Sequence, residues 1–470
     1  MSLNLKFHLT VLMVLCLAGC SPRSVNSKDA KAIKGLSEPV HLDSPTARTQ
    51  ASSEQDTTSS LESPSQKALR KNGTLRFLGP PRLKEIEVPD FSGAHSIWGA
   101  TGRDNLGRIY FGVSAYGVDD PSARLMRLDP ALNRFQDLGA VNNRLSELKQ
   151  RRSDPYPEIQ MKIHSKIVQA ADGRMYFSSQ DVSDEVGDGS KNSVFGGRLF
   201  ALDPKTDLWE CVLATPEGLI AVACNKRYVF AMGYFGHVLN QFDTETRQTR
   251  SIRLGTVGGH VSRNLFVDSR EHVFAIRLAG YDGDETSGVS QLNGQQVRAT
   301  LVELDDQLQE IAQTPLDDYQ PTADTESHGM TGFARMLNGE LVFVTHSGSI
   351  WQVSPGKDHQ PSSVQRLGWF HPEGSVYVAS LFSPTGSRFV GGFAKQKNQS
   401  YEWVVFDIEQ RRSTAMALNA TSRKLLERDG LAIYGCDTLG DQLQAYGVGW
   451  QRIARGYGPS ILQISWPELD

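Results

Sequence analysis

Four of the eleven histidines in this 470-residue sequence occupy equivalent places in an internal repeat. They are His95, His164, His260 and His328, and each precedes a phenylalanine (111, 177, 274 or 343) by a similar number of residues. Imidazole titrates near neutral pH and binds metals, so a ring of such residues suits proton transfer or metal binding. A histidine at a strand start can equally hydrogen-bond a neighbouring strand, and repeat ancestry alone would also place four of them there.

The densest set of chemically useful side chains lies between residues 226 and 264 and comprises Tyr234, His237, Arg250, Arg253 and His260. A phenol can transfer a proton, and a guanidinium can bind a carboxylate through two parallel hydrogen bonds. The same stretch contains three strand-like runs separated by polar turns, which is nearly one complete antiparallel unit. Its residues therefore suggest one wall of a binding or catalytic site.

The element that must position these residues is a short apolar strand ending in an acidic or serine turn. It occurs seven times, at residues 125–130, 199–204, 239–244, 301–306, 350–355, 403–408 and 461–466. Short alternating strands repeated at 40- to 75-residue intervals, flanked by turn residues, indicate radial all-β repetition. We therefore predict an all-β, seven-bladed β-propeller. Six or eight blades remain alternatives, because residues 424–451 are difficult to assign.

A fourth strand ending in Leu-Gly follows several repeats, at Leu138-Gly139, Leu254-Gly255 and Leu367-Gly368, but the last repeat lacks one. Residues 74–79, Thr-Leu-Arg-Phe-Leu-Gly, have the same pattern near the other end of the chain. We predict that this N-terminal segment supplies the outer strand of the last blade, which would remove an exposed sheet edge.

In a propeller, the first strand of each blade starts on the face where the second strand ends. Residues near the end of the second strand should therefore gather on the same face as the histidines. These residues are Tyr116, Gln180, Tyr234, Tyr281 and His346.

The N-terminus carries targeting signals. Lys6 precedes an apolar run that ends in Leu-Ala-Gly-Cys20, which resembles a bacterial lipobox followed by Ser21. We expect a signal peptide at residues 1–19, lipidation (palmitate included) at Cys20, a flexible tether at residues 20–71, and the propeller at residues 72–470. This pattern predicts a lipid-anchored protein of the cell envelope, at the outer membrane of a Gram-negative bacterium. A plain secretory signal with an incidental cysteine is the alternative.

A histidine at the head of an inner strand, a tyrosine at the end of a later second strand and an arginine sixteen positions further on resemble the seven-bladed ulvan lyases. The resemblance covers residues 73–470. It implies β-elimination in a sulfated, uronate-containing polysaccharide, with no organic cofactor. It also implies that His164 and Tyr234 transfer protons and that Arg250 neutralises the uronate carboxylate.

Topology leaves the choice of arginine open, because Arg250 falls early in an outer strand. Arg253, near the end of that strand, and Arg263 would lie closer to the histidines. The resemblance nevertheless ranks Arg250 first, with Arg253 second. We further expect five residues to bind substrate: Arg253, Tyr281, His95, His260 and His328.

A structural metal ion held by His260 and His328 is also left open, since no compact Cys/His motif is present. Cys211 and Cys224 could form a disulfide, leaving Cys436 single. The net charge of −4 argues against a nucleic-acid partner. We expect a monomer whose partners are an anionic polysaccharide and, through its anchor, a membrane. The alternative function is a non-catalytic propeller lipoprotein that binds glycan or acts as a scaffold.

Overall fold

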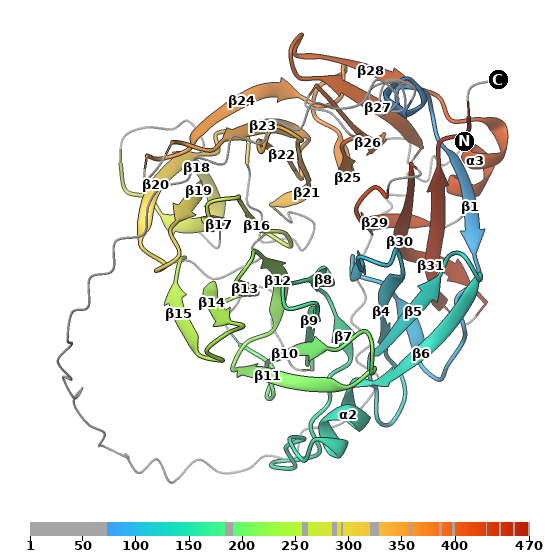
Figure 1. Cartoon of the computed structure of the whole chain (residues 1–470), viewed down its shortest axis with the longest axis vertical. Coiled ribbons are helices and arrows are strands. Elements are labelled where there is room, and N and C mark those ends of the chain that lie inside the picture. Colours follow the sequence, from blue (N-terminus) through green and yellow to red (C-terminus); the bar gives the residue numbers. More distant parts are fainter. Residues whose placement is uncertain are drawn as a thin grey trace, which may run out of the picture. The chain divides into compact units, whose positions relative to one another are not determined.

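The computed structural model describes residues 73–183, 191–255, 262–283, 289–292, 295–319, 329–357, 360–384, 388–396, 400–428, 430–440, 443–454 and 456–468. All of them belong to one compact unit of the chain, Glu62–Asp470. Their strands form seven antiparallel sheets around a central axis (Figure 1). The prediction of an all-β seven-bladed propeller is therefore confirmed, and the six- and eight-bladed alternatives are wrong.

The first three blades follow the chain in order. In blade 1, β2 (Ala94–Ser96) and β3 (Thr101–Arg103) both pair with β4 (Ile109–Ala115), followed by β5 (Arg124–Asp129) and β6 (Arg134–Ala140). In blade 2, β7 (Lys162–Ile163) and β8 (Val168–Gln169) pair with β9 (Met175–Gln180), followed by β10 (Gly197–Leu202) and β11 (Trp209–Thr215). Blade 3 consists of β12 (Leu219–Cys224), β13 (Tyr228–Gly233), β14 (Val238–Asp243) and β15 (Thr249–Arg253).

The next three blades repeat this order. Blade 4 contains β16 (Phe266–Val267), β17 (Val273–Gly280), β19 (Gln295–Leu304) and β20 (Glu310–Pro315), with β18 (Val289–Leu292) paired to β19. Blade 5 contains β21 (Met330–Arg335), β22 (Leu341–Thr345), β23 (Ser349–Ser354) and β24 (Ser363–Trp369). Blade 6 contains β25 (Tyr377–Phe382), β26 (Phe389–Lys395), β27 (Tyr401–Asp407) and β28 (Arg412–Met416).

Blade 7 joins the two ends of the propeller. It contains β29 (Ala432–Cys436), β30 (Gln444–Ile453), β31 (Gly456–Ser465) and the N-terminal strand β1 (Arg82–Ile86). Arg82 pairs with Ser465 and Ile86 with Ile461. An N-terminal strand thus closes the last blade, as predicted.

The identity of that closing strand was predicted wrongly, because residues 73–77 are helical and β1 begins after Pro80-Pro81. Five residues with an apolar residue at every second position suit one helical turn as well as a strand. Proline lacks an N–H and disfavours helix before it, so the chain changes conformation here. The helical turn instead inserts Phe77 against Trp403 and Trp466, with ring centroids 5.4 and 5.3 Å apart.

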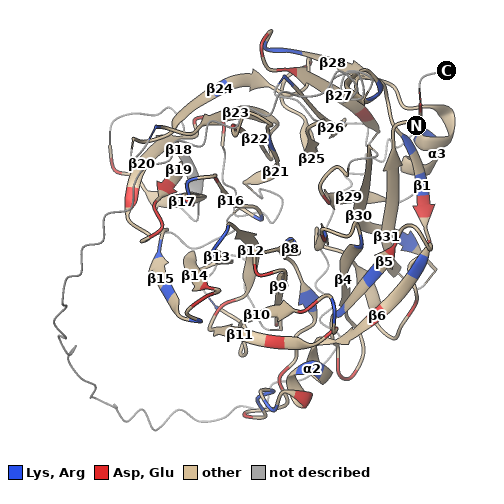
Figure 2. Ribbon diagram, in the orientation of Figure 1, with Lys and Arg blue, Asp and Glu red and all other residues tan. Residues whose placement is uncertain are grey.

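Burial decreases from the second strand of a blade toward its outer edge. Every residue of β4 and β9 is buried, whereas β15 exposes four of its five residues. Second strands contact neighbouring blades on both faces, which explains their nearly continuous apolar runs. Lysine, arginine, aspartate and glutamate are distributed over all the blades, without one charged sector (Figure 2).

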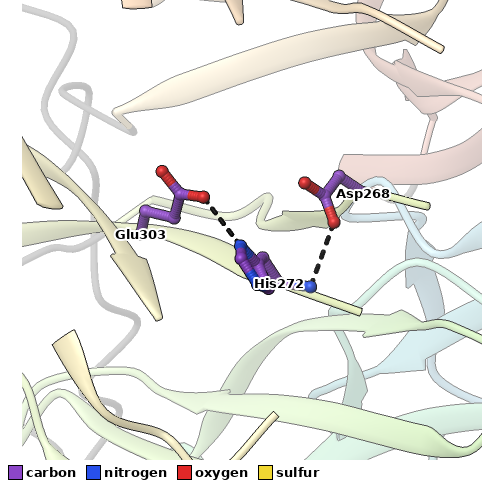
Figure 3. Close-up of side chains that lie close together, drawn as sticks. All are labelled: Asp268, His272 and Glu303. Atoms are coloured by element: carbon purple, nitrogen blue, oxygen red, sulfur yellow. Dashed lines mark hydrogen bonds and ion pairs between the residues drawn. The ribbon is translucent and has the colours of Figure 1, made fainter. Parts of the chain in front are cut away.

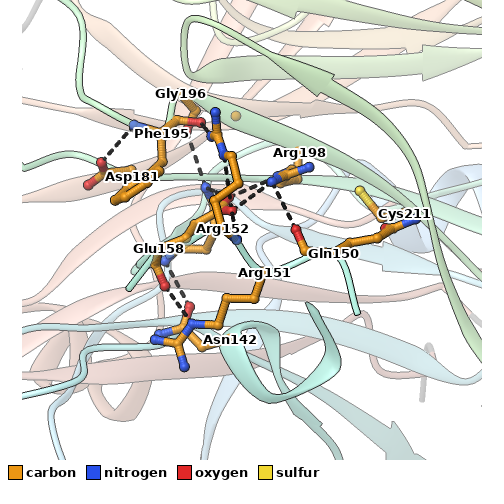
Figure 4. A network of polar contacts seen from close by, with 12 residues as sticks. Asn142, Gln150, Arg151, Arg152, Glu158, Asp181, Phe195, Gly196, Arg198 and Cys211 are labelled. Carbon is orange, nitrogen blue, oxygen red and sulfur yellow. Dashed lines mark hydrogen bonds and ion pairs between the residues drawn. The ribbon is translucent and has the colours of Figure 1, made fainter. Parts of the chain in front are cut away.

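Two short helices cross between blades: α2 (Val141–Glu147) after β6 and α3 (Ala420–Leu426) after β28. The segment after α2 is fixed to blade 2 by the buried carboxylate of Glu158 (Figure 4). Glu158 accepts hydrogen bonds from Arg198 Nε and Nη2 at 2.8 and 2.6 Å and from the Arg152 backbone N–H at 3.0 Å. This network holds the chain that leads into β7. Among the described residues, no helix is long and apolar enough to cross a membrane.

The disulfide suggested for Cys211 and Cys224 is not formed, because both thiols are free, as is that of Cys436. Cys211 lies on β11, the outer strand of blade 2, and Cys224 on β12, the first strand of blade 3. β11 and β12 follow each other in the sequence but do not pair, since the chain crosses between them from the rim of one blade to the axis of the next.

Candidate functional site

A small pocket lies on the propeller axis, where five blades meet. Blade 1 supplies Trp98 and Gly99, and blade 2 supplies His164 and Lys166. The segment before β16, the first strand of blade 5 and the first strand of blade 7 complete the lining with Arg263, Asn264, Thr331, Tyr434 and Gly435. Because the lining comes from or beside first strands, this pocket is at the centre of the ring.

Tyr234 lies next to His164, a residue of the pocket lining, as the propeller topology predicts. Their ring centroids are 5.6 Å apart and the rings are nearly perpendicular, at 88°. Both side chains are buried, with 2% and 4% exposure. His164 follows β7 and Tyr234 follows β13, so the pair joins the start of a first strand to the end of a second strand.

Arg263 is the charged centre of the pocket, with 5% exposure. Its guanidinium carbon lies 3.9 Å from the centre of the Tyr434 ring, and its Nη2 donates a hydrogen bond to Tyr377 Oη at 2.7 Å. Burial alone would lower the pKa of Arg263, but the two phenols outweigh burial and raise it, so the group stays charged. Among the described residues, Nε and Nη1 have no hydrogen-bond partner and no carboxylate pairs with the cation.

His346 lies beside Tyr377, with ring centroids 5.1 Å apart. Burial, and then the positive charge of Arg263, lowers the pKa of His346 to about 4. The imidazole is therefore neutral near pH 7. It adds no second positive charge beside Arg263.

These groups form a continuous sequence of contacts across the axis. His164 stacks on Tyr434 with centroids 6.4 Å apart and an interplanar angle of 30°, so Tyr434 connects the His164–Tyr234 pair to Arg263. Blades 3, 2, 7, 6 and 5 and the segment leading into blade 4 each contribute one member. We call this set the channel row: Tyr234, His164, Tyr434, Arg263, Tyr377 and His346.

An aromatic cluster flanks the channel row over blades 1 and 7. The ring centroids of Trp98 and Trp450 are 4.7 Å apart, and Tyr434 lies 5.4 Å from Trp98 and 5.1 Å from Trp450. Trp98 and Trp450 are only partly buried. The ammonium group of Lys162 lies 4.7 Å from the centre of the Trp98 ring and 5.9 Å from that of Tyr234. Flat rings beside cations suit an anionic ligand that has apolar faces.

Lys166 adds a second cation inside the pocket. Its ammonium group donates a hydrogen bond to the Cys436 carbonyl oxygen. Burial lowers the pKa of Lys166 to about 8, so most of the group is charged near pH 7. Lys166 and Arg263 thus make the pocket electropositive.

The turn that carries Tyr234 is held by the buried carboxylate of Glu217. This carboxylate accepts hydrogen bonds from the backbone N–H groups of Phe235, Gly236 and Val238 at 3.2, 2.5 and 3.2 Å. The Tyr234 N–H donates to the Gly218 carbonyl at 2.8 Å. Burial raises the pKa of Glu217, and the three N–H groups oppose that rise. The Glu217 carboxylate thus fixes the turn that follows Tyr234, and the Gly218 carbonyl holds Tyr234 itself.

Arg250 and Arg253 are not brought into the pocket. Both lie on the outer strand β15 and are exposed, and Arg250 donates a hydrogen bond to Gln307. Arg253 is at the end of the strand, where its positive charge acts on Glu217. Arg263, the third arginine considered from the sequence, is the one that reaches the channel row.

The remaining predicted site residues have different positions. His95 lies on β2, with its ring 4.9 Å from Tyr116 and 5.6 Å from Tyr457, and burial lowers its pKa. Tyr281, just after β17, stacks under the Arg298 guanidinium at 4.1 Å. His260, His328 and the lipidation site Cys20 lie outside the described residues.

One group of side chains in the described part of the chain has metal-ligand character: Asp268, His272 and Glu303 in blade 4 (Figure 3). His272 Nδ1 is 2.7 Å from Glu303 Oε1. Arg270 Nη2 lies 2.7 Å from both Asp268 Oδ2 and Glu303 Oε1, which places a guanidinium between the two carboxylates. The Arg270 guanidinium therefore already lies between the two carboxylates and offsets part of their negative charge, which leaves this set poorly suited to a metal ion. His260 and His328 take no part in it.

The sequence patterns do not point to four aromatic residues of this region: Tyr434, Tyr377, Trp98 and Trp450. Tyr434 and Trp450 fall within residues 424–451, whose strands have no regular spacing. A signal was present for Tyr377, because it begins the first strand of blade 6, one position before the place that His95 holds in the first strand of blade 1.

No family model matches this chain, and no curated protein matches it either. Solved structures with similar architecture include U3-55K, with 12% identity, a TM-score of 0.47 and coverage of 82% of this chain and 100% of that one. Hydrazine synthase from Kuenenia stuttgartiensis has 9% identity, a TM-score of 0.47 and coverage of 80% and 98%. Sqt1 from Chaetomium thermophilum has 11% identity, a TM-score of 0.46 and coverage of 78% and 83%. At these values the similarities carry no argument about activity.

Proposed function

We propose that this propeller is a polysaccharide lyase that cleaves uronate-containing, ulvan-type polysaccharides by β-elimination at the channel row. The observation that carries the proposal is Arg263, a buried cation without a carboxylate partner among the described residues, in the same pocket as His164. A buried charge is costly unless an opposite charge or hydrogen bonds compensate it. The carboxylate of a uronate would supply that compensation.

β-Elimination requires a cation that binds the uronate carboxylate and groups that transfer protons, and the channel row contains residues of both kinds. The C5 proton of a uronate is a weak acid, and removing it develops negative charge on the adjacent carboxylate. A guanidinium that binds the carboxylate stabilises this charge. In this proposal Tyr234 and His164, whose ring centroids are 5.6 Å apart, transfer the protons. The arginine in this role is Arg263 and not Arg250.

The size of the pocket limits how a substrate would bind. Its cavity volume is ≈ 10 Å³, about enough for one water molecule. A sugar ring therefore does not fit inside. We expect the ring to rest above the pocket, against Trp98 and Trp450, with only its carboxylate entering toward Arg263.

The test is the ultraviolet absorbance of the C4–C5 double bond, which elimination creates and hydrolysis does not. The protein is mixed with ulvan, with other uronate polysaccharides and with a neutral polysaccharide. We expect absorbance to rise with a uronate polymer only. We expect Arg263→Gln to lower the rate by about 10²–10³-fold, as for loss of one transition-state donor, while the matched variant Arg250→Gln retains the wild-type rate. No rise with any uronate polymer, from protein shown to be folded, would refute the proposal.

A non-catalytic glycan-binding function is the second candidate, and the cluster of Trp98, Tyr434 and Trp450 favours it. Such a protein would bind a uronate polysaccharide but release no unsaturated product. Trp450→Ala should weaken binding under either function. Tyr234→Phe should leave binding intact under either function. If the protein is a lyase, the same variant should also lose turnover, whereas a non-catalytic protein has no turnover to lose.

We also propose that Cys20 is lipidated and that residues 20–71 tether the propeller to the outer membrane. The proposal comes from the Leu-Ala-Gly-Cys sequence and the polar composition that follows it. Cys20→Ser should move the protein from the membrane fraction to the soluble fraction and prevent incorporation of labelled palmitate. Unchanged fractionation and labelling would contradict lipidation at this residue.

A further inference from the structure

The channel row contains a second tyrosine with a histidine beside it, on the other side of Arg263. Tyr377 and His346 come from blades 6 and 5, and Tyr234 and His164 from blades 3 and 2. The two pairs differ in one respect that matters for chemistry. Tyr377 contacts the Arg263 guanidinium directly, whereas His164 and Tyr434 stand between Tyr234 and Arg263 in the row.

We propose that Tyr377 is the base that removes the C5 proton, and that the His164–Tyr234 pair protonates the leaving oxygen. This assignment rests on the proposed lyase reaction and refines it. The two tyrosines then have separate tasks at opposite ends of the breaking bonds.

Proximity is the first argument for Tyr377. Its oxygen lies 2.7 Å from Arg263 Nη2. A carboxylate bound to the same guanidinium would be its immediate neighbour. In a uronate, C5 is bonded to the carboxylate carbon, so the proton to be removed is two bonds from the bound group. Tyr377 thus presents its oxygen beside the place where the bound carboxylate would hold the reacting carbon.

Electrostatics is the second argument. The Arg263 guanidinium donates a hydrogen bond to the Tyr377 oxygen, so its positive charge lies beside both groups that carry negative charge during the reaction, the base and the substrate carboxylate. The neighbouring imidazole of His346 is neutral near pH 7 because burial and Arg263 lower its pKa to about 4. Because this lowered pKa disfavours an imidazolium, the partly exposed Tyr377 releases its proton to solvent before catalysis and not to His346. In this state the site contains a phenolate, a guanidinium and a substrate carboxylate.

The reaction balances without an oxidant or a water molecule. The Tyr377 phenolate takes the C5 proton, and the C5–H electron pair forms the C4–C5 double bond. The C4–O bond breaks, and its electrons go to the leaving oxygen, which takes a proton from Tyr234 or His164. Proton exchange with solvent then restores both tyrosines.

The experiment separates the two roles with two substrates. One is a uronate polysaccharide, whose leaving alkoxide needs a proton. The other is a 4-deoxy-4-fluoro uronide, whose fluoride leaves without general-acid help. Both yield the same conjugated double bond, so one absorbance assay follows both. Tyr377→Phe and Tyr234→Phe are compared with wild type and with the control Tyr156→Phe, a partly exposed tyrosine in the segment between blades 1 and 2.

We expect Tyr377→Phe to lose about 10²–10⁴-fold in kcat on both substrates, the range for removing a general base. Tyr234→Phe should lose a similar factor on the polysaccharide but eliminate fluoride within a few-fold of wild type. Tyr156→Phe should match wild type. Circular dichroism and melting temperature establish that each variant is folded.

Several outcomes would overturn the assignment. Tyr377→Phe retaining wild-type turnover of the polysaccharide would remove Tyr377 from the reaction while leaving the lyase proposal intact. The reversed pattern, with fluoride elimination surviving only in Tyr377→Phe, would exchange the two roles. Wild-type protein inactive on both substrates would refute the lyase reaction itself, and with it this assignment.

Discussion

Replacing Arg263 by methionine should remove activity without unfolding the propeller. Arg263 is buried and, among the described residues, has two nitrogens without hydrogen-bond partners and no carboxylate counter-ion. Methionine fills a similar elongated space and carries no charge. The stability that Arg263 contributes therefore depends on whether its remaining contacts outweigh the loss of its hydration.

The relevant energies nearly cancel. Burying a guanidinium costs several kcal/mol. Its contact with the Tyr434 ring contributes about 2 kcal/mol when desolvated, and its charged hydrogen bond to Tyr377 contributes about 1.5–3 kcal/mol. We therefore expect Arg263→Met to change the free energy of unfolding by no more than about 1 kcal/mol, in either direction.

Arg198 is the matched control, because it is also a buried arginine but has a carboxylate partner. Its Nη2 lies 2.6 Å from Glu158 Oε2, and the Glu158 side chain is fully buried. Arg198→Met leaves that carboxylate without its main partner and should cost about 3–5 kcal/mol. Urea unfolding of the three proteins, followed by tryptophan fluorescence, measures both differences. Equal destabilisation by the two substitutions would refute the view that Arg263 lacks a counter-ion.

Three further predictions concern the propeller itself. Burial alone would raise the pKa of Glu158, but Arg198 and Arg152 hold it below its ordinary value. The charged Glu158 therefore stabilises the fold above the pKa of the unfolded carboxyl, and this stabilisation is lost as pH falls through the pKa of the folded carboxyl. Acid unfolding of Glu158→Gln should depend less on pH than that of wild type, and equal dependence would contradict this. A Cβ on Gly102 would lie 1.6 Å from the Ile167 carbonyl oxygen, whereas one on Gly447 meets nothing closer than 3.4 Å. Gly102→Ala should therefore lower the free energy of unfolding by about 1–3 kcal/mol or more, and a smaller loss than in Gly447→Ala would contradict this reasoning. Because Arg270 lies between Asp268 and Glu303, a chelator should leave the melting temperature unchanged; a lower melting temperature that zinc restores would show that the cluster binds metal.

The sequence by itself determined the architecture and half of the channel row. Strand patterning is local, because alternating apolar residues and acidic turns can be identified within each segment of six to eight residues. All seven repeated strands are third strands of blades in the structure. His164 and Tyr234 also followed from topology alone, since the start of a first strand and the end of a second strand meet on one face.

Only the tertiary structure decided which arginine and which second tyrosine join that pair. Arg263 lies in an irregular segment before β16, and its contacts are with Tyr377 and Tyr434, from blades 6 and 7. Residues more than 100 positions apart meet there because the ring closes, and no local periodicity encodes that distance. The closing strand was likewise misplaced because residues 74–79 and 82–86 have similar apolar patterns. The packing of Phe77 against Trp403 and Trp466, together with Pro80-Pro81, settled between them.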